Sequence, residues 1–189
     1  MVPEAPLERN ENGLWPTGDG WFVLNARESR WREREGRGLC AALTGESDLE
    51  CETLFPQVGV NLFVLQPGEP IGMYHWEADH EEFLVLYGEP LLIVEGAERP
   101  LRQWDFVHCP PGTTHIIVGA GSGPCAVLAI GGREHVSENC NGGAYVVDEA
   151  ARRRGASVEE ETTDPDVAYA RYPEPEVAPY RDGLLPGAG

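Results

Sequence analysis

The middle of the chain alternates short apolar runs with breaks rich in glycine and proline. The apolar runs contain many β-branched and aromatic residues, a pattern typical of strands rather than helices. Pro67-Gly68 suits a type II turn, and the segments 88–90 and 95–98 suit hairpins. We therefore predict consecutive antiparallel strands at residues 21–25, 58–65, 83–87, 91–95, 105–109, 114–118, 125–130 and 145–147.

The chain has the size of a single domain. Its 189 residues are 41% hydrophobic, enough for one core. We expect an N-terminal extension (1–56) contributing one or two strands, a β-barrel core (57–147), and short helices with a proline-rich tail (148–189). Asp148–Arg154 followed by Gly155, and Asp164 followed by Pro165, predict the two helices. The tail from Arg171 either wraps the barrel or is disordered.

The charge of the chain excludes several classes of partner. Lys and Arg total 14 against 32 Asp and Glu, a net charge of −18, so nucleic acid and anionic membranes should be repelled. Arginines alternate with glutamates over 30–37, which we interpret as a solvated segment. Membrane-length apolar runs and a signal-peptide pattern are absent, so we expect a cytoplasmic protein.

The cysteines give no sign of a metal site. They lack CxxC spacing and are odd in number, so we expect reduced, mostly buried thiols. The five are Cys40, Cys51, Cys109, Cys125 and Cys140.

Metal chemistry is instead indicated by two stretches that contain histidine. His75 and Glu77 are two residues apart, so on a strand both side chains point to the same face. His115 follows the Pro110–Gly112 turn, which can direct it back across a barrel. Neutral imidazole and carboxylate are good ligands for Zn, Fe or Mn.

These stretches resemble the two motifs of the cupin family. The first motif runs Gly, five residues, His-x-His, three or four residues, Glu, six residues, Gly. The second runs Gly, five residues, Pro-x-Gly, two residues, His, three residues, Asn. His75 and Glu81 match the first motif, since six residues separate Glu81 from Gly88, and the 110–112 turn with His115 matches the second.

The match departs from the family pattern at several positions. Glu77 stands at the second histidine, Trp104 at the glycine that opens the second motif, and Gly119 at its asparagine. Gly72 also lies only two residues before His75. The resemblance covers about residues 58–131.

The resemblance implies a fold and a site. The fold is an all-β, single antiparallel cupin-type β-barrel, or jelly roll, with short C-terminal helices and an extended tail. The site is one divalent metal ion (Zn, Fe or Mn) held in the barrel mouth by His75, Glu77, Glu81 and His115. Edge-strand pairing, as in many cupins, would make the protein a homodimer.

Three functions are compatible with such a site. In the first, the protein is a small-molecule enzyme of oxygenase or isomerase type, with Glu77 as a fourth ligand or as a general base. In the second, it is a non-catalytic module that binds or senses a small molecule. In the third, it contains no metal, and the same side chains form a polar network.

Other polar and aromatic residues near these motifs have simpler interpretations. Glu82 competes with Glu81 for the ligand position, because a single bulge would exchange the faces they occupy. His80 is interpreted as part of an exposed ion-paired loop, His108 as a hydrogen-bonded residue of the barrel wall, and His135 as a surface residue. Four aromatic residues could line a pocket or belong to the core: Tyr74, Trp76, Phe83 and Trp104.

Overall fold

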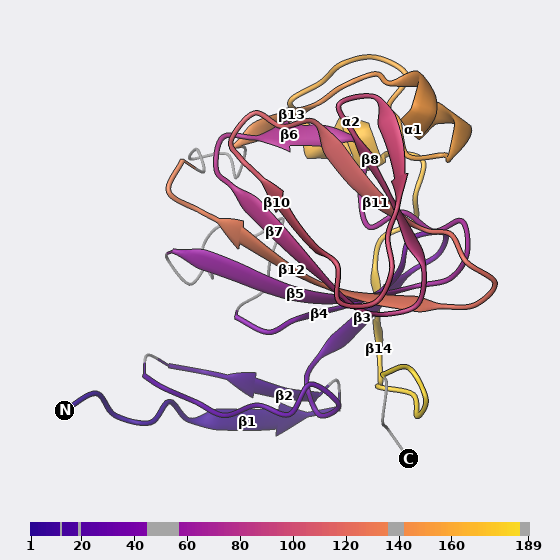
Figure 1. Ribbon diagram of the computed structural model, residues 1–189. Coiled ribbons are helices and arrows are strands. Elements are labelled where there is room, and N and C mark those ends of the chain that lie inside the picture. Colours follow the sequence, from indigo (N-terminus) through magenta and orange to yellow (C-terminus); the bar gives the residue numbers. More distant parts are fainter. Residues whose placement is uncertain (12, 19, 45–56, 136–141, 186–189) are drawn as a thin grey trace.

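Two antiparallel β-sheets lie face to face and form most of the protein (Figure 1). The computed structural model describes residues 1–11, 13–18, 20–44, 57–135 and 142–185. The larger sheet has the strand order β10 (Phe106–Cys109), β7 (Glu81–Tyr87), β12 (Cys125–Gly132), β5 (Val58–Leu65), β4 (Gly38–Ala42), β3 (Trp31–Arg34), β14 (Glu176–Ala178). The smaller sheet has the order β13 (Gly143–Tyr145), β6 (His75–Glu77), β11 (His115–Gly119), β8 (Pro90–Val94), β9 (Ala97–Pro100). This is the antiparallel jelly-roll architecture predicted from the sequence.

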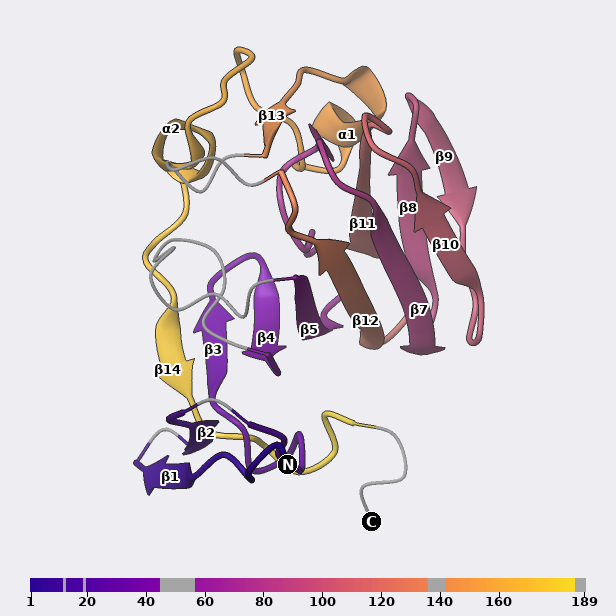
Figure 2. The ribbon, with the colours of Figure 1, turned by 90° about the vertical axis from the view of Figure 1, so that its left-hand side faces the viewer.

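A hairpin and two short helices lie at opposite ends of the sheets (Figure 2). The hairpin pairs β1 (Leu7–Asn10) with β2 (Gly13–Pro16). The helix α1 (Glu149–Arg153) begins where the Asp148 side chain accepts a hydrogen bond from the Ala151 amide. The helix α2 (Pro165–Tyr169) is capped in the same way by Asp164. Both predicted helices are therefore confirmed.

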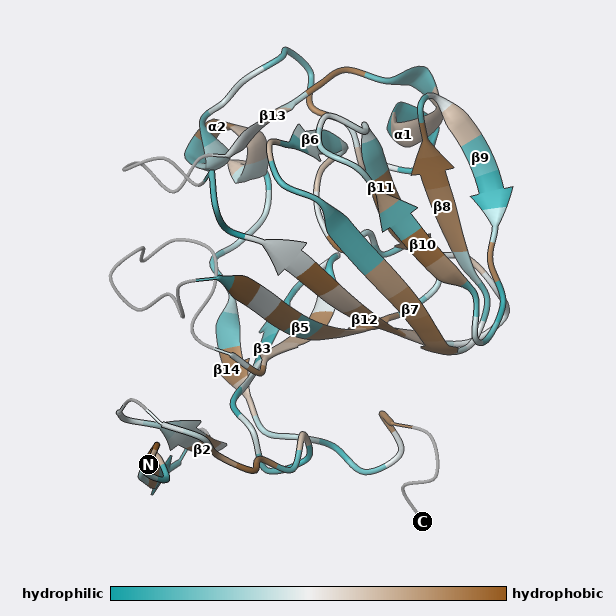
Figure 3. Ribbon diagram, turned by 60° about the vertical axis from the view of Figure 1, so that its left-hand side comes forward, coloured by the Kyte–Doolittle hydropathy of each residue, from teal (hydrophilic) through white to brown (hydrophobic). Residues whose placement is uncertain are grey.

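The main core fills the space between the two sheets. β8 and β11 are almost entirely buried, and in Figure 3 the hydrophobic colour runs along β8. Ala150 and Ala151 of α1 pack against the same core. Because β11 carries His115 at its first position, this buried strand gives the imidazole a rigid mount.

The strands β3, β4 and β5 have two faces of different character. On one face, Trp31, Leu39 and Val64 belong to a second apolar cluster, against which Tyr180 of the C-terminal tail also packs. The Trp31 side chain is fully buried, its indole N–H donates to the carbonyl of Ala26 at 2.8 Å, and its ring centroid lies 5.9 Å from that of Tyr180. Because side chains alternate along a strand, the side chains of Arg30 and Arg32, on either side of Trp31, lie on the opposite face.

The central predicted strands are confirmed, but the N-terminal one is wrong. Residues 22–25 form no strand, and Trp21 makes only an isolated bridge to Glu4. Trp21 and Val23 are exposed, so apolar composition alone did not bring this segment into a sheet. Four strands (β1 to β4) occur before residue 45 instead of one or two, and β6, β9 and β14 were not predicted as strands.

The described part of the tail, residues 171–185, wraps the larger sheet. Its strand β14 pairs with β3, so the tail covers that edge. Cys109 and Cys125 are buried thiols, as expected, while Cys51 and Cys140 lie outside the described residues. In the described part of the chain, no helix has both the length and the apolar character needed to span a bilayer.

The second apolar cluster predicts a strong effect of Trp31→Ala. Removing a fully buried indole should lower the free energy of unfolding by about 3–5 kcal/mol, because the cavity cannot collapse completely. Chemical denaturation measures this loss. Trp104→Ala is the matched control, since Trp104 is 67% exposed and its loss should change stability by only about 0.5 kcal/mol. Equal losses in the two variants would contradict the packing described.

Candidate metal centre

Two histidines and one glutamate meet where the ends of the two sheets approach each other. His75 of β6 is the direct register partner of His115 of β11, and their ring centroids are 5.1 Å apart. Glu81 is the first residue of β7, in the other sheet. One ligand atom from each of the three residues lies within 4.8 Å of the others. Both sheets therefore contribute to one cluster.

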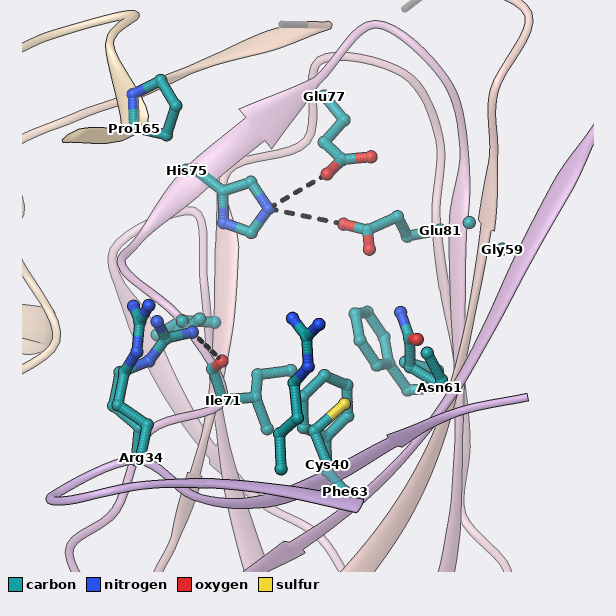
Figure 4. A pocket seen from close by; sticks show the side chains of 18 of the residues that line it. Arg34, Cys40, Gly59, Asn61, Phe63, Ile71, His75, Glu77, Glu81 and Pro165 are labelled. Carbon is teal, nitrogen blue, oxygen red and sulfur yellow. Dashed lines mark hydrogen bonds and ion pairs between the residues drawn. The ribbon is translucent and has the colours of Figure 1, made fainter. Parts of the chain in front are cut away.

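The Glu81 carboxylate is the shared partner of the two imidazoles. Its Oε2 lies 2.8 Å from Nε2 of His115 and 3.6 Å from Nε2 of His75. Glu77 lies beside this group, with Oε1 3.4 Å from Nε2 of His75 (Figure 4). His115 is buried and Glu81 nearly so, whereas the Glu77 side chain is 36% exposed. Glu77 is therefore adjacent to the three-residue cluster without belonging to it.

Backbone carbonyls fix the orientation of both imidazole rings. Nδ1 of His75 lies 2.7 Å from the carbonyl oxygen of Met73, and Nδ1 of His115 lies 3.0 Å from that of Thr113. A carbonyl only accepts, so each Nδ1 carries the hydrogen and donates it. Each Nε2 then faces Glu81. This is the arrangement in which outer hydrogen bonds orient histidine ligands toward a metal.

The cluster has a donor set that suits a cation. Nε2 of His115 and Oε2 of Glu81 are both buried without a hydrogen-bond partner, although they are only 2.8 Å apart. Buried polar atoms left in this state are costly unless something else satisfies them. Two imidazole nitrogens and one carboxylate oxygen are ligands for Zn, Fe or Mn. These residues therefore fit a divalent metal ion.

Without a metal, protons take the place of the cation. Burial opposes ionisation of Glu81, but His115 and His75 outweigh it and lower the Glu81 pKa to about 2. Burial also opposes a charge on His115, but the Cys109 side chain and the Glu81 carboxylate outweigh it and raise its pKa to about 9. The carboxylates of Glu77 and Glu81 likewise overcome burial and raise the pKa of His75 well above its usual value.

The neighbouring Glu82 occupies the opposite face of β7. Its two carboxylate oxygens contact His80 at 3.7 Å and His108 at 3.1 Å. The structure therefore separates the two competing glutamates, with Glu81 among the buried histidines and Glu82 outside. His80 is exposed and ion-paired, as expected. The expectation for His108 is wrong, since its side chain is 54% exposed and does not pack within the wall.

The departures from the motif pattern have local explanations. Trp104, at the position of a motif glycine, has φ = 72°, in the left-handed region that glycine adopts readily. Gly119, at the position of the motif asparagine, lies against the Gln66 carbonyl, and a Cβ there would overlap it. His135 is exposed, as expected, and Nδ1 of its ring lies 2.7 Å from Asp79.

A cavity of about 340 Å³ opens beside the cluster. His75, Glu77 and Glu81 line one part of it (Figure 4). Of the four aromatic residues considered from the sequence, only Phe83 lines this cavity. Tyr74 lies in the core, where its hydroxyl donates to Thr114 Oγ1 at 2.8 Å, and Trp104 is exposed.

Sequence reasoning missed several residues of the cavity wall. Tyr145, the register partner of His75 in β13, and Tyr169 of α2 reach the cavity through contacts between distant segments that no local pattern reveals. The interpretation of residues 30–37 as a solvated segment is wrong. Arg30, Arg32 and Arg34 are half-buried and line the cavity. Their period-two spacing around Trp31 was a usable signal.

Comparison with known proteins identifies the domain. Residues 61–131, which contain His75, Glu81 and His115, match the family model of the cupin domain. These residues therefore resemble a cupin domain over the part of the chain that carries the candidate site. No curated protein matches the chain.

A solved cupin structure shares the fold, and two further solved structures show a weaker similarity. A sugar phosphate isomerase of the cupin superfamily from Silicibacter pomeroyi is 23% identical, with a TM-score of 0.53, over 67% of this chain and 82% of its own. A proposed sugar phosphate isomerase from Acidithiobacillus ferrooxidans is 30% identical, with a TM-score of 0.40, over 42% of this chain. This chain covers about half (52%) of that protein. The polyketide cyclase RemF from Streptomyces resistomycificus is 14% identical, with a TM-score of 0.48, over 64% of this chain and 89% of its own.

The electrostatic coupling in the cluster predicts the effect of Glu81→Gln on His115. Without the carboxylate, the Cys109 contact still opposes the effect of burial, but the His115 pKa should fall from about 9, by roughly 1–3 units. NMR titration of the imidazole carbons in metal-free protein measures the shift. Glu82→Gln, which removes the neighbouring charge on the outer face, should leave the His115 titration unchanged. A similar shift in both variants would show that the Glu81 contact is not its cause.

Proposed function

We propose that this cupin is a metal-dependent enzyme that acts on a small molecule bound in the cavity. The observation that supports it most directly is the convergence of Nε2 of His115, Oε2 of Glu81 and Nε2 of His75, of which the first two are buried and contact each other at 2.8 Å. In this proposal, His75, Glu81 and His115 are the ligands of one divalent ion, Zn, Fe or Mn. The cavity beside them leaves room for a substrate at the remaining coordination positions.

Glu77 is assigned to proton transfer rather than to the ligand set. It lies next to His75 but outside the group whose ligand atoms converge, and its partial exposure lets it exchange protons with a substrate. A bound divalent ion would supply Lewis acidity to a substrate oxygen. A carboxylate base beside such a centre favours isomerase-type chemistry, in which Glu77 takes a proton from a carbon next to a carbonyl and returns it elsewhere.

Oxygenase chemistry is the second candidate. Two histidines and one carboxylate are also the ligand set of non-haem iron oxygenases, so three converging ligands with open positions favour this alternative. The identity of the metal distinguishes the two, because the oxygenase requires iron whereas proton transfer does not. A non-catalytic binding module would contain the metal and the cavity without either activity.

The homodimer expected from the sequence remains a prediction. The proposed N-terminal pairing strand does not form, and β14 already covers the β3 edge of the larger sheet. β10, which ends the sheet on the other side, carries the exposed Phe106.

Metal analysis tests the proposed ligands. After dialysis in metal-free buffer, wild-type protein without a histidine tag should retain about one equivalent of metal, and His115→Ala and Glu81→Gln should retain almost none, since loss of one of three ligands removes most of the affinity. Glu82→Gln and His108→Ala are matched controls and should bind as the wild type does. Elemental analysis measures the content. Absence of metal from the wild type, or its retention in both ligand variants, would refute the site.

Deuterium exchange tests the assignment of Glu77. In D₂O, the metal-loaded protein should introduce deuterium next to the carbonyl of substrates found in a panel of α-hydroxy aldehydes and ketones, as measured by mass spectrometry. Glu77→Gln should retain the metal but slow exchange by roughly 10²–10⁴-fold, the usual contribution of a general base. Loss of the metal together with exchange would instead identify Glu77 as a fourth ligand. Unchanged exchange would exclude it as the base.

A further inference from the structure

Five arginines line the cavity that contains the candidate metal centre. The chain contains no lysine, so its 14 basic residues are all arginines, against 32 acidic residues. The cavity contains more than a third of these arginines. We call this group the arginine wall: Arg30, Arg32, Arg34, Arg37 and Arg133. It is a concentration of positive charge inside a strongly acidic protein.

Strand geometry places three members of the wall on one surface. Arg30, Arg32 and Arg34 alternate along and just before β3, with the fully buried Trp31 between the first two. Because Trp31 faces the apolar cluster beneath the sheet, the three arginines face the cavity. In Figure 4, Arg34 lies across the cavity from Glu77 and Glu81.

Aromatic rings and a carbonyl hold several of these guanidinium groups in place. Arg37 lies 4.2 Å from the ring centroid of Tyr169 and donates a hydrogen bond to the carbonyl of Ile71. Arg34 lies 5.7 Å from the same ring, and Arg30 lies 5.3 Å from the ring of Trp15. Cation–π contacts of this kind fix the position of the charge. Arg34 also forms an ion pair, with its Nη2 4.0 Å from Oε2 of the exposed Glu174.

The backbone leaves room for the fifth arginine. Gly59 of β5 lies beneath the guanidinium of Arg133, and a Cβ at Gly59 would overlap three of its atoms. Within the described residues, Nη1 of Arg133 and Nε of Arg37 are buried donors without a hydrogen-bond acceptor. Buried donors that lack an acceptor are energetically unfavourable. A small shift of these side chains toward an acceptor in the cavity would allow each donor to form a hydrogen bond.

The acidic side chains of the cavity are already engaged with histidines. Glu77 and Glu81 contact His75, and Asp79 contacts His135. The cavity therefore has two chemically distinct parts, a histidine–carboxylate centre and the arginine wall. Guanidinium groups match the geometry of phosphate and carboxylate, which they bind through paired, charge-assisted hydrogen bonds.

We propose that the arginine wall is the binding site for the anionic group of the ligand, a phosphate or a carboxylate carried by a small molecule. A cavity of about 340 Å³ is at the small end of ligand sites. The other end of the molecule reaches His75 and Glu81, which line the same cavity, and this second part of the inference rests on the proposed function. The substrate class is thus a small phosphorylated or carboxylated compound.

Binding of inorganic phosphate and of malonate to metal-free protein tests the wall separately from the metal. Isothermal titration calorimetry at constant ionic strength should show binding of at least one anion in the millimolar range or tighter. Arg32→Gln and Arg133→Gln should each weaken it by roughly tenfold or more, the value of one charged hydrogen bond. Arg102→Gln is the matched control, because its side chain is 88% exposed and outside the cavity. It should bind as the wild type does.

Each outcome has a defined meaning. Tighter binding of phosphate than of malonate assigns a phosphorylated ligand, and the reverse order assigns a carboxylated one. Failure of the folded wild type to bind either anion at about 20 mM, or equal binding by both cavity variants and the control, overturns the proposal. Circular dichroism establishes that the variants fold. Two cavity variants are used so that the test still stands if one of them does not fold. Metal content, measured separately in the same proteins, reports on the proposed function alone.

Discussion

The buried carboxylate of Glu81 is the group on which the rest of the site depends. A charge this well shielded from water is stable only with a compensating partner, and two imidazoles on the facing sheet provide it. Those imidazoles can approach because His75 and His115 are register partners, while Glu81 begins a strand of the other sheet. The centre therefore links the two sheets at their shared end. Displacing either sheet would leave a buried charge without its partner.

The same constraint means that protons and a metal ion would compete for this position. In the metal-free protein, the low pKa of Glu81 and the high pKa of His115 both reflect the ion pair that these two groups form. An ion bound by both Nε2 atoms would have to displace the protons held there. The carbonyls of Met73 and Thr113 prepare the rings for this, because they hold each Nδ1 hydrogen and leave each Nε2 directed inward.

Local patterns in the sequence were sufficient for the central sheets, the helices and the three clustered residues. Strands such as Val58–Leu65 have β-branched composition and clear turns at their ends, so burial and propensity agree. His75 and His115 were accessible through strand parity and the turn before His115. Glu81 was preferred over Glu82 only because its spacing to Gly88 matches the cupin motif.

Features that depend on long-range packing could not be predicted in this way. The strand Trp31–Arg34 has a single apolar residue among charged ones, and only its burial against the tail reveals it as part of the sheet. The prediction for segment 21–25 was wrong for the opposite reason, because the segment has the composition of a strand but pairs only through the isolated bridge between Trp21 and Glu4. His108 shows the same limit, since parity placed it on one of two faces without indicating which was outside.

The arginine wall is positively charged, although the molecule as a whole is strongly negative. At a net charge of −18, the protein repels anions at long range, so steering cannot concentrate an anionic ligand near the cavity. Screening in physiological salt limits this repulsion to about 8 Å. Inside the cavity, however, guanidinium groups fixed by aromatic rings and a carbonyl dominate. For the anionic ligand that we propose, selection therefore has to occur within the cavity, where arginines lie on one wall and His75 and Glu81 on another.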